Sequence, residues 1–185
     1  MNAAAARLRE GPVHTVIQGS HRIARREEVV LSTLLGSCVA ACLWDEAAQV
    51  GGMNHFLLPT ARTTDEREAN VSRGAHAMEL LINDLLKAGA SRYGLRAKLF
   101  GGARIRAGLT DVGEQNAAFA ERFLADEGIP VESSSLRGDR GRRLQFWPMS
   151  GRARQIFMAA GEAAAPAPRV VAPPPPATGG ELELF

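Results

Sequence analysis

Short apolar runs separated by glycine, proline or polar turn residues are the feature that most constrains the fold of this chain. Three such runs follow one another over residues 28–35, 39–44 and 50–58. Runs of this length, bounded by turn signals, are typical of buried strands, whereas helices need a longer periodic segment. The first third of the chain is therefore predicted to form part of a β-sheet.

Two later segments have apolar residues at helical spacing and are each followed by a glycine. We predict helices over 71–88, before Gly89, and over 114–127, before Gly128. The polar stretch 60–70 is predicted to be a loop. Further strands are predicted over 95–100, 129–136, 142–147 and 153–159. Seven strands and two helices indicate a sheet-based α/β fold.

The segment 159–185 differs in composition from the rest, because it contains 6 of the 10 prolines in the chain. Such a segment buries too little apolar surface to offset its ordering entropy, and we expect a disordered tail. Its last residues, 181–185, alternate acidic and apolar side chains and could add a strand to a partner. We expect a flexible N terminus over 1–11 and a single folded domain over 12–158.

Composition excludes several classes of protein. The net charge is only +2, and no apolar run approaches the roughly 18 residues of a membrane-spanning helix. The N terminus lacks the features of a secretory leader, so we expect a cytoplasmic protein without membrane insertion. Nucleic-acid binding is not expected, because the one basic cluster has an acidic residue inside it and no aromatic platform. That cluster comprises Arg137, Arg140, Arg142 and Arg143 around Asp139.

One cysteine and one histidine form a candidate catalytic pair. If the runs 39–44 and 50–58 form an antiparallel hairpin around 45–48, Cys38 lies directly opposite His55. Directly opposed side chains have Cβ atoms about 5 Å apart, within reach of a hydrogen bond from the thiol to the imidazole. The thiolate that results when an imidazole takes the thiol proton attacks carbonyl carbon.

Other groups needed for such chemistry lie close by in the sequence. Gly36 and Ser37 suit a tight turn whose N–H groups can stabilise an oxyanion. Ser32 lies an even number of residues before the cysteine and could orient the imidazole, with Thr33 as the alternative. On spacing alone, a purely structural cysteine and histidine are equally consistent with the pattern.

The second cysteine, Cys42, is interpreted as a core residue. A disulfide between Cys38 and Cys42 fails on distance, because four strand residues span roughly 13 Å. These cysteines and His55 lack a fourth ligand at any standard spacing, so no metal site is expected. His14, His21 and His76 are interpreted as structural or solvated residues.

Two motifs resemble those of a known family. Leu-Gly-Ser-Cys-Val-Ala over 35–40 and Gly-Gly-Met-Asn-His-Phe-Leu-Leu-Pro over 51–59 resemble the motifs of CheD, the chemoreceptor glutamine deamidase family of bacterial chemotaxis. Residues 98–103 and 112–116 and the late Gly/Arg segment 138–142 extend the resemblance over most of the predicted domain.

The resemblance implies a three-layer α/β sandwich similar to that of bacterial toxin deamidases. It also implies hydrolysis of glutamine side chains on methyl-accepting chemotaxis receptors, without a cofactor. Cys38 matches the family's nucleophile and His55 its general base, while Ser32 falls by spacing at the family's third catalytic position, normally a Thr, with Thr33 next to it. Some family members also act as receptor methylesterases and bind the phosphatase CheC. A non-catalytic regulator or adaptor of chemotaxis proteins and a receptor-glutamate methylesterase are the alternative functions.

Overall fold

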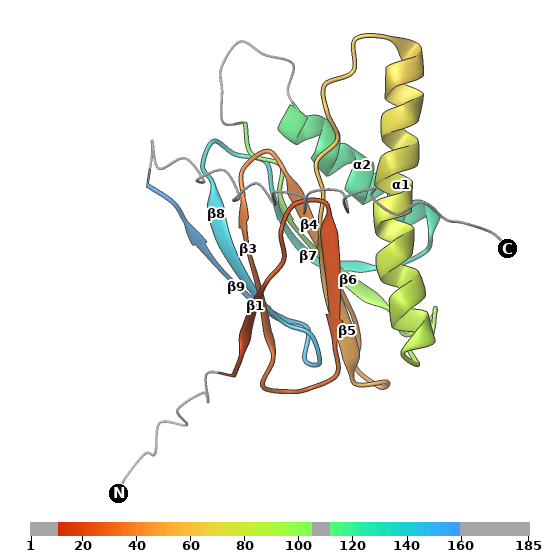
Figure 1. Cartoon of the computed structure of the whole chain (residues 1–185), viewed down its shortest axis with the longest axis vertical. Helices are drawn as coiled ribbons and strands as arrows, with labels where there is room; N and C mark the ends of the chain where they lie inside the picture. Colours follow the sequence, from red (N-terminus) through yellow and green to blue (C-terminus); the bar gives the residue numbers. More distant parts are fainter. Residues whose placement is uncertain (1–10, 105–111, 160–185) are drawn as a thin grey trace, which may run out of the picture.

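Two β-sheets packed face to face, with two helices on the outer side of one sheet, make up the protein (Figure 1). The computed structural model describes residues 11–104 and 112–159. These layers of sheet, sheet and helices confirm the expected three-layer α/β fold. The tail expected over 159–185 and its alternating end over 181–185 lie, apart from Ala159, outside the described residues, as does all of the N-terminal segment 1–11 except Gly11.

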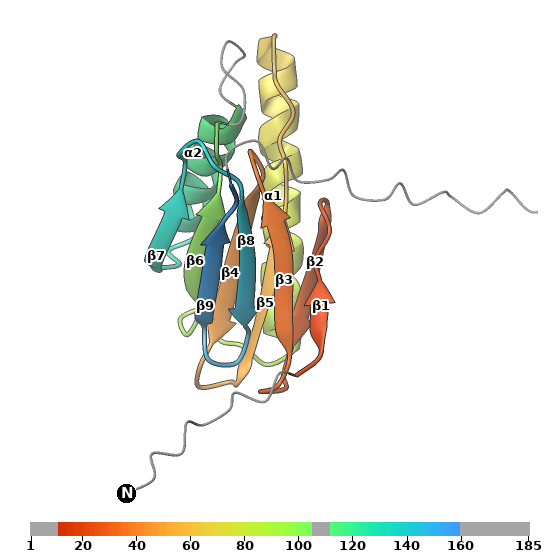
Figure 2. The ribbon, with the colours of Figure 1, turned by 90° about the vertical axis from the view of Figure 1, so that its left-hand side faces the viewer.

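The four-stranded sheet has the strand order β1-β3-β8-β9 and faces the viewer in Figure 2. β1 is parallel to β3, and the other neighbouring strands are antiparallel. The strands are β1 (Val13–Thr15), β3 (Val30–Leu35), β8 (Arg142–Trp147) and β9 (Arg152–Phe157).

The five-stranded sheet has the order β2-β5-β4-β6-β7, and only β6 and β7 are parallel. Its strands are β2 (Ser20–Ala24), β4 (Val39–Asp45), β5 (Val50–His55), β6 (Arg96–Gly101) and β7 (Val131–Leu136). The helices α1 (Thr64–Lys87) and α2 (Val112–Asp126) cover the outer face of this sheet.

The five-stranded sheet separates two hydrophobic cores, and β4 contributes to both. Ala40, Cys42 and Trp44 pack between the sheets, while the intervening residues Ala41 and Leu43 pack against the helices. A strand covered on both faces has a continuous apolar sequence instead of an alternating one. The interpretation of Cys42 as a core residue is confirmed, since its exposed fraction is 0%.

The start of α1 and the first two strands differ from the sequence prediction. Helix α1 begins at Thr64, inside the predicted loop, because Thr63 and Glu66 form a capping box that stabilises a polar first turn. Strands β1 and β2 were not predicted. Their residues are partly exposed and include no apolar run, so the sequence has no strand signal there.

The turn between β4 and β5 comprises residues 46–49, one residue later than predicted. Asp45 pairs with Val50, and its carboxylate accepts a hydrogen bond of 3.0 Å from the Ala48 N–H group. Gln49 closes the turn with a φ angle of 51°. Aspartate side chains commonly stabilise turns in this way. Because the turn is later, each residue of β4 pairs with a β5 residue two positions further along the chain than predicted.

Gly74 on α1 lies in close contact with Phe119 on α2. A Cβ atom at this position would lie 2.6 Å from the ring of Phe119 on α2. We expect Gly74→Ala to lower the free energy of unfolding by about 1–3 kcal/mol, because the added methyl group overpacks the core. Urea unfolding followed by circular dichroism measures this change.

The matched control is Ser72→Ala, at an exposed position of the same helix. It should change the free energy of unfolding by no more than about 0.5 kcal/mol. A more stable Gly74→Ala protein would contradict the contact, since helix propensity alone favours alanine by up to about 1 kcal/mol.

Candidate active site

Cys38 and His55 lie on the same face of the five-stranded sheet but are not directly opposed. β4 and β5 pair at Cys42 and Met53, and an isolated bridge joins Val39 to Phe56. In this register Ala40 lies opposite His55, so the predicted direct pair of Cys38 and His55 is wrong. The two residues are diagonal neighbours instead, whose Cα atoms typically lie about 7–8 Å apart.

The imidazole of His55 is held by Thr33 of the other sheet and by Val16 of the connection between β1 and β2. The Thr33 hydroxyl lies 2.8 Å from the Val16 carbonyl oxygen and 2.8 Å from Nδ1 of His55. A carbonyl only accepts, so the hydroxyl donates to Val16 and its oxygen accepts the Nδ1–H of His55. The Val16 oxygen also lies 3.3 Å from Nδ1. The proton is therefore on Nδ1, and Nε2 carries the lone pair.

Nε2 of His55 is buried and has no hydrogen-bond partner among the described residues. The pKa of His55 is lowered, because burial disfavours the imidazolium ion, while the Val16 carbonyl opposes this shift. The side chain is thus a neutral imidazole at neutral pH, with a free lone pair that can accept a proton.

The hydroxyl that contacts His55 is Thr33, not Ser32. Ser32 donates a hydrogen bond of 2.9 Å to the carbonyl oxygen of Leu144 in the neighbouring strand β8. The alternation of side chains along β3 does not continue to Cys38, because β3 ends at Leu35 and Gly36 and Ser37 form bends. The structure thus brings the alternative residue, Thr33, to the imidazole.

The Cys38 thiol is partly buried and donates a hydrogen bond of 3.3 Å to Oε1 of Gln18. Burial raises the pKa of the Cys38 thiol to about 11, although its own backbone N–H group opposes this shift. At neutral pH both the thiol and the imidazole of His55 are uncharged. Proton transfer from sulfur to nitrogen would therefore accompany nucleophilic attack instead of preceding it.

The turn 36–38 has all three of its carbonyl oxygens in hydrogen bonds. The Ser37 oxygen accepts from Nδ2 of Asn116 at 3.1 Å, and the other two accept from the N–H groups of Gly102 and Ala103 at 2.8 Å each. A trans peptide places each carbonyl opposite the following N–H group. The N–H groups of Ser37 and Cys38 therefore point away from the groups that bind the carbonyl oxygens. Neither N–H group donates to another residue that the structure describes. Both are available to an oxyanion.

Asn116 joins this turn to the segment that follows β5. Its Oδ1 accepts a hydrogen bond of 2.7 Å from the Leu58 N–H group, and its Nδ2 also donates to the Val112 carbonyl oxygen. The sequence pointed to Asn116 only through the family resemblance. A further signal is its place on the apolar face of the predicted helix, and in the structure its side chain is fully buried.

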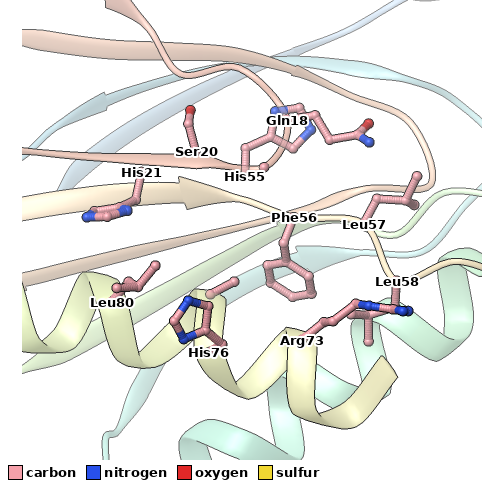
Figure 3. Close-up of a pocket in the computed structure, with 12 residues that line it drawn as sticks. Gln18, Ser20, His21, His55, Phe56, Leu57, Leu58, Arg73, His76 and Leu80 are labelled. Carbon is pink, nitrogen blue, oxygen red and sulfur yellow. The ribbon is translucent and has the colours of Figure 1, made fainter. Parts of the chain in front are cut away.

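Gln18 and Val16 are site residues that sequence analysis missed altogether. They belong to the connection between β1 and β2, where the sequence has no motif. A cleft of about 240 Å³ lies between this connection and α1. Figure 3 shows Gln18 and His55 on one side of the cleft and Arg73 and His76, from α1, on the other.

Two further observations concern metals and membranes. Over residues 11–104 and 112–159, no three His, Cys, Asp or Glu side chains are grouped so that they could bind a metal ion. None of the helices in these ranges is long and apolar enough to span a bilayer.

The buried amide of Asn116 should contribute strongly to stability. We expect Asn116→Ala to lower the free energy of unfolding by about 2–4 kcal/mol, because it leaves the buried Leu58 N–H group and the Ser37 carbonyl group without their partner. Urea unfolding measures the loss. Gln115→Ala, at the adjacent exposed position of α2, is the control. Equal stability of the two variants would contradict the role of the amide.

The protonation state of the pair can be tested by alkylation. We expect iodoacetamide to modify Cys38 slowly at neutral pH and faster as the pH rises through about 11, since only the thiolate reacts. Mass spectrometry of the labelled peptide gives the rate. Cys38→Ala leaves only the buried Cys42 and should remain unlabelled while folded. Fast labelling that is already constant at neutral pH would instead indicate a preformed ion pair with His55.

The chain matches known proteins over most of its length. Residues 57–155 match the family model described as CheD chemotactic sensory transduction. A "Probable chemoreceptor glutamine deamidase CheD" of Acidiphilium cryptum is 57% identical, over 92% of each chain. Proteins with the same description are 57% identical in Rhizobium meliloti, over 88% of this chain and 87% of the relative, and 53% identical in Caulobacter vibrioides, over 92% and 91%.

Among solved structures, the hypothetical protein YfiH of Bacillus licheniformis covers 69% of this chain and 61% of its own, with a TM-score of 0.43 and 16% identity. The curated relatives cover about nine-tenths of the chain, and the family model matches the part that follows His55. The chain belongs to the CheD family.

Proposed function

We propose that this protein is a chemoreceptor glutamine deamidase, which hydrolyses glutamine side chains of methyl-accepting chemotaxis receptors to glutamate and ammonia. The observation that carries the proposal is the Nδ1-anchored imidazole of His55, whose free Nε2 lies on the same sheet face as the Cys38 thiol. The descriptions of the curated relatives support the same activity.

In the first half of the reaction, His55 Nε2 takes the thiol proton and the Cys38 sulfur attacks the Cδ of the substrate glutamine. The carbonyl π electrons move to oxygen, and the N–H groups of Ser37 and Cys38 stabilise this oxyanion. His55 then gives its proton to the amide nitrogen. Ammonia leaves as the carbonyl reforms, and the product is a thioester on Cys38.

In the second half, His55 takes a proton from a water molecule that attacks the thioester. The carbonyl reforms, and the sulfur leaves and regains a proton from His55. The released carboxylic acid ionises to glutamate. Throughout, the Thr33 oxygen accepts from Nδ1–H and stabilises the positive charge that develops on the imidazole.

The substrate is a folded protein surface, and the cleft beside His55 supports this proposal. Phe56, Leu58 and Leu80 supply apolar surface to the cleft, and Arg73 supplies a cation. A receptor helix lying along α1 would present one side chain toward His55. Because the receptor segments concerned are cytoplasmic helices, we place the protein in the cytoplasm, with CheC as a proposed regulatory partner.

The assay uses purified protein and a receptor cytoplasmic fragment, with peptide mass spectrometry to detect conversion of glutamine to glutamate. Conversion by the wild-type protein and its absence in Cys38→Ala are the expected results. Conversion that persists in Cys38→Ala would rule out this mechanism. Methanol release from methylated receptors without deamidation would indicate a methylesterase, and receptor binding without either reaction would indicate an adaptor.

The role of Thr33 can be separated from that of its neighbour. We expect Thr33→Val to lower kcat about 100-fold, because the imidazole loses the acceptor that fixes its tautomer and orientation. Thr33→Ser, which retains the hydroxyl, should recover most of the activity. Ser32→Ala is the matched control and should change kcat less than about threefold, since its hydroxyl contacts only Leu144. A larger loss in Ser32→Ala than in Thr33→Val would reassign the orienting group.

A further inference from the structure

The connection between β1 and β2, residues 16–19, lies against both members of the catalytic pair. The Val16 carbonyl oxygen accepts from Thr33 and His55, and the Gly19 N–H group donates to the His55 carbonyl oxygen at 2.7 Å. Gly19 has a φ of 81°, a conformation that favours glycine. The backbone on either side of Gln18 is therefore fixed relative to His55.

The side chain of Gln18 contacts the nucleophile. Its Oε1 accepts the hydrogen bond from the Cys38 thiol, and its Nε2 donates to no described residue. Gln18 itself is exposed at the cleft (Figure 3). An exposed amide with two free donor protons, placed next to a nucleophilic sulfur, is available to a substrate.

We propose that Gln18 is a catalytic residue that donates a hydrogen bond from Nε2 to the oxyanion formed on the substrate amide, in addition to the backbone N–H groups of Ser37 and Cys38. This inference rests on the proposed deamidase function. The oxyanion is bonded to the carbon that the Cys38 sulfur attacks, so it forms within about 3 Å of that sulfur. Oε1 of the Gln18 amide already lies 3.3 Å from the sulfur, so rotation of this amide would bring its donor, Nε2, into the range of an oxyanion contact.

A primary amide suits both stages of the reaction. Before attack, Oε1 accepts the S–H of Cys38; once the proton has moved to His55, the sulfur has no proton to donate and Oε1 has lost its partner. Rotation of the terminal amide torsion, which has a broad and roughly twofold energy profile, then presents Nε2–H. A carboxylate at this position accepts but cannot donate, and an alkyl side chain does neither.

The kinetic test compares Gln18→Ala and Gln18→Glu with the wild-type protein on a receptor fragment. We expect both variants to lower kcat at least about 100-fold, the typical loss for one oxyanion donor, while KM changes less than about threefold. Ile17→Ala is the matched control, because Ile17 is the exposed neighbour in the same connection. Unchanged kcat in Gln18→Ala, or a change in KM alone, would overturn the proposal.

A second test needs no receptor and uses the pH dependence of Cys38 alkylation by iodoacetamide. If Nε2 donates to the ionised sulfur, Gln18→Ala should shift the labelling midpoint to higher pH, and Gln18→Glu should shift it further because the carboxylate repels the thiolate. Ile17→Ala should leave the midpoint unchanged. Identical midpoints in the two Gln18 variants and the wild-type protein, with thermal unfolding unaltered, would overturn the proposal.

The two tests separate failure of the inference from failure of the proposed function. If the wild-type protein does not deamidate receptors but the Gln18 variants show the expected midpoint shifts, the deamidase function is refuted. The hydrogen bond from Gln18 to the Cys38 sulfur is then still supported. Peptide mass spectrometry of the purified protein gives one more outcome. Conversion of Gln18 itself to glutamate would overturn the proposal, since the resulting carboxylate could not donate.

Discussion

The hydrogen bond between the Thr33 hydroxyl and Nδ1 of His55 spans the interface of the two sheets, and the arrangement of the candidate site depends on it. Thr33 belongs to β3 in the four-stranded sheet and His55 to β5 in the five-stranded sheet. The bond forms in a buried layer, where an unpaired imidazole N–H group would be costly. The two sheets must therefore pack in one relative position for the imidazole to be satisfied and its other nitrogen left free.

Two of the crossings between the sheets lie at the same end, and they supply the remaining groups of the site. Residues 16–19 lead from β1 to β2, and residues 36–38 lead from β3 to β4. Because β1 and β3 are parallel neighbours, both strands end at the same edge of the sheet. Gln18 and Cys38, which lie 20 residues apart in the sequence, are thereby brought into contact.

Burial shifts the pKa values of Cys38 and His55 in opposite directions, but in both cases it favours the uncharged side chain. It raises the pKa of the Cys38 thiol and lowers that of His55, so both are neutral before substrate binds. A neutral pair avoids the cost of isolated charges between the sheets. The consequence for catalysis is that charge develops only during the reaction, where the free N–H groups of the turn 36–38 can stabilise it.

The sequence by itself determined most of the strands, the buried character of β4 and β5, the helix over α2 and the identity of the Cys–His pair as a candidate. These features depend on local apolar patterns and on motifs at short range. It did not determine the start of α1, where capping groups rather than apolar residues set the boundary, or the strands β1 and β2, whose partly exposed residues lack such a pattern.

Only the tertiary structure decided which groups surround Cys38 and His55. The Asp45 side chain stabilises a turn over residues 46–49, and this turn sets the register between β4 and β5. In that register Cys38 and His55 are diagonal neighbours. Thr33, not Ser32, contacts the imidazole, and the bends after β3 break the alternation that the prediction had extended to Cys38. Asn116 and Gln18 reach the site from a distant helix and from an unpatterned connection. Contacts of this kind depend on how the two sheets and the helix layer pack, and no spacing within one strand or hairpin contains that information.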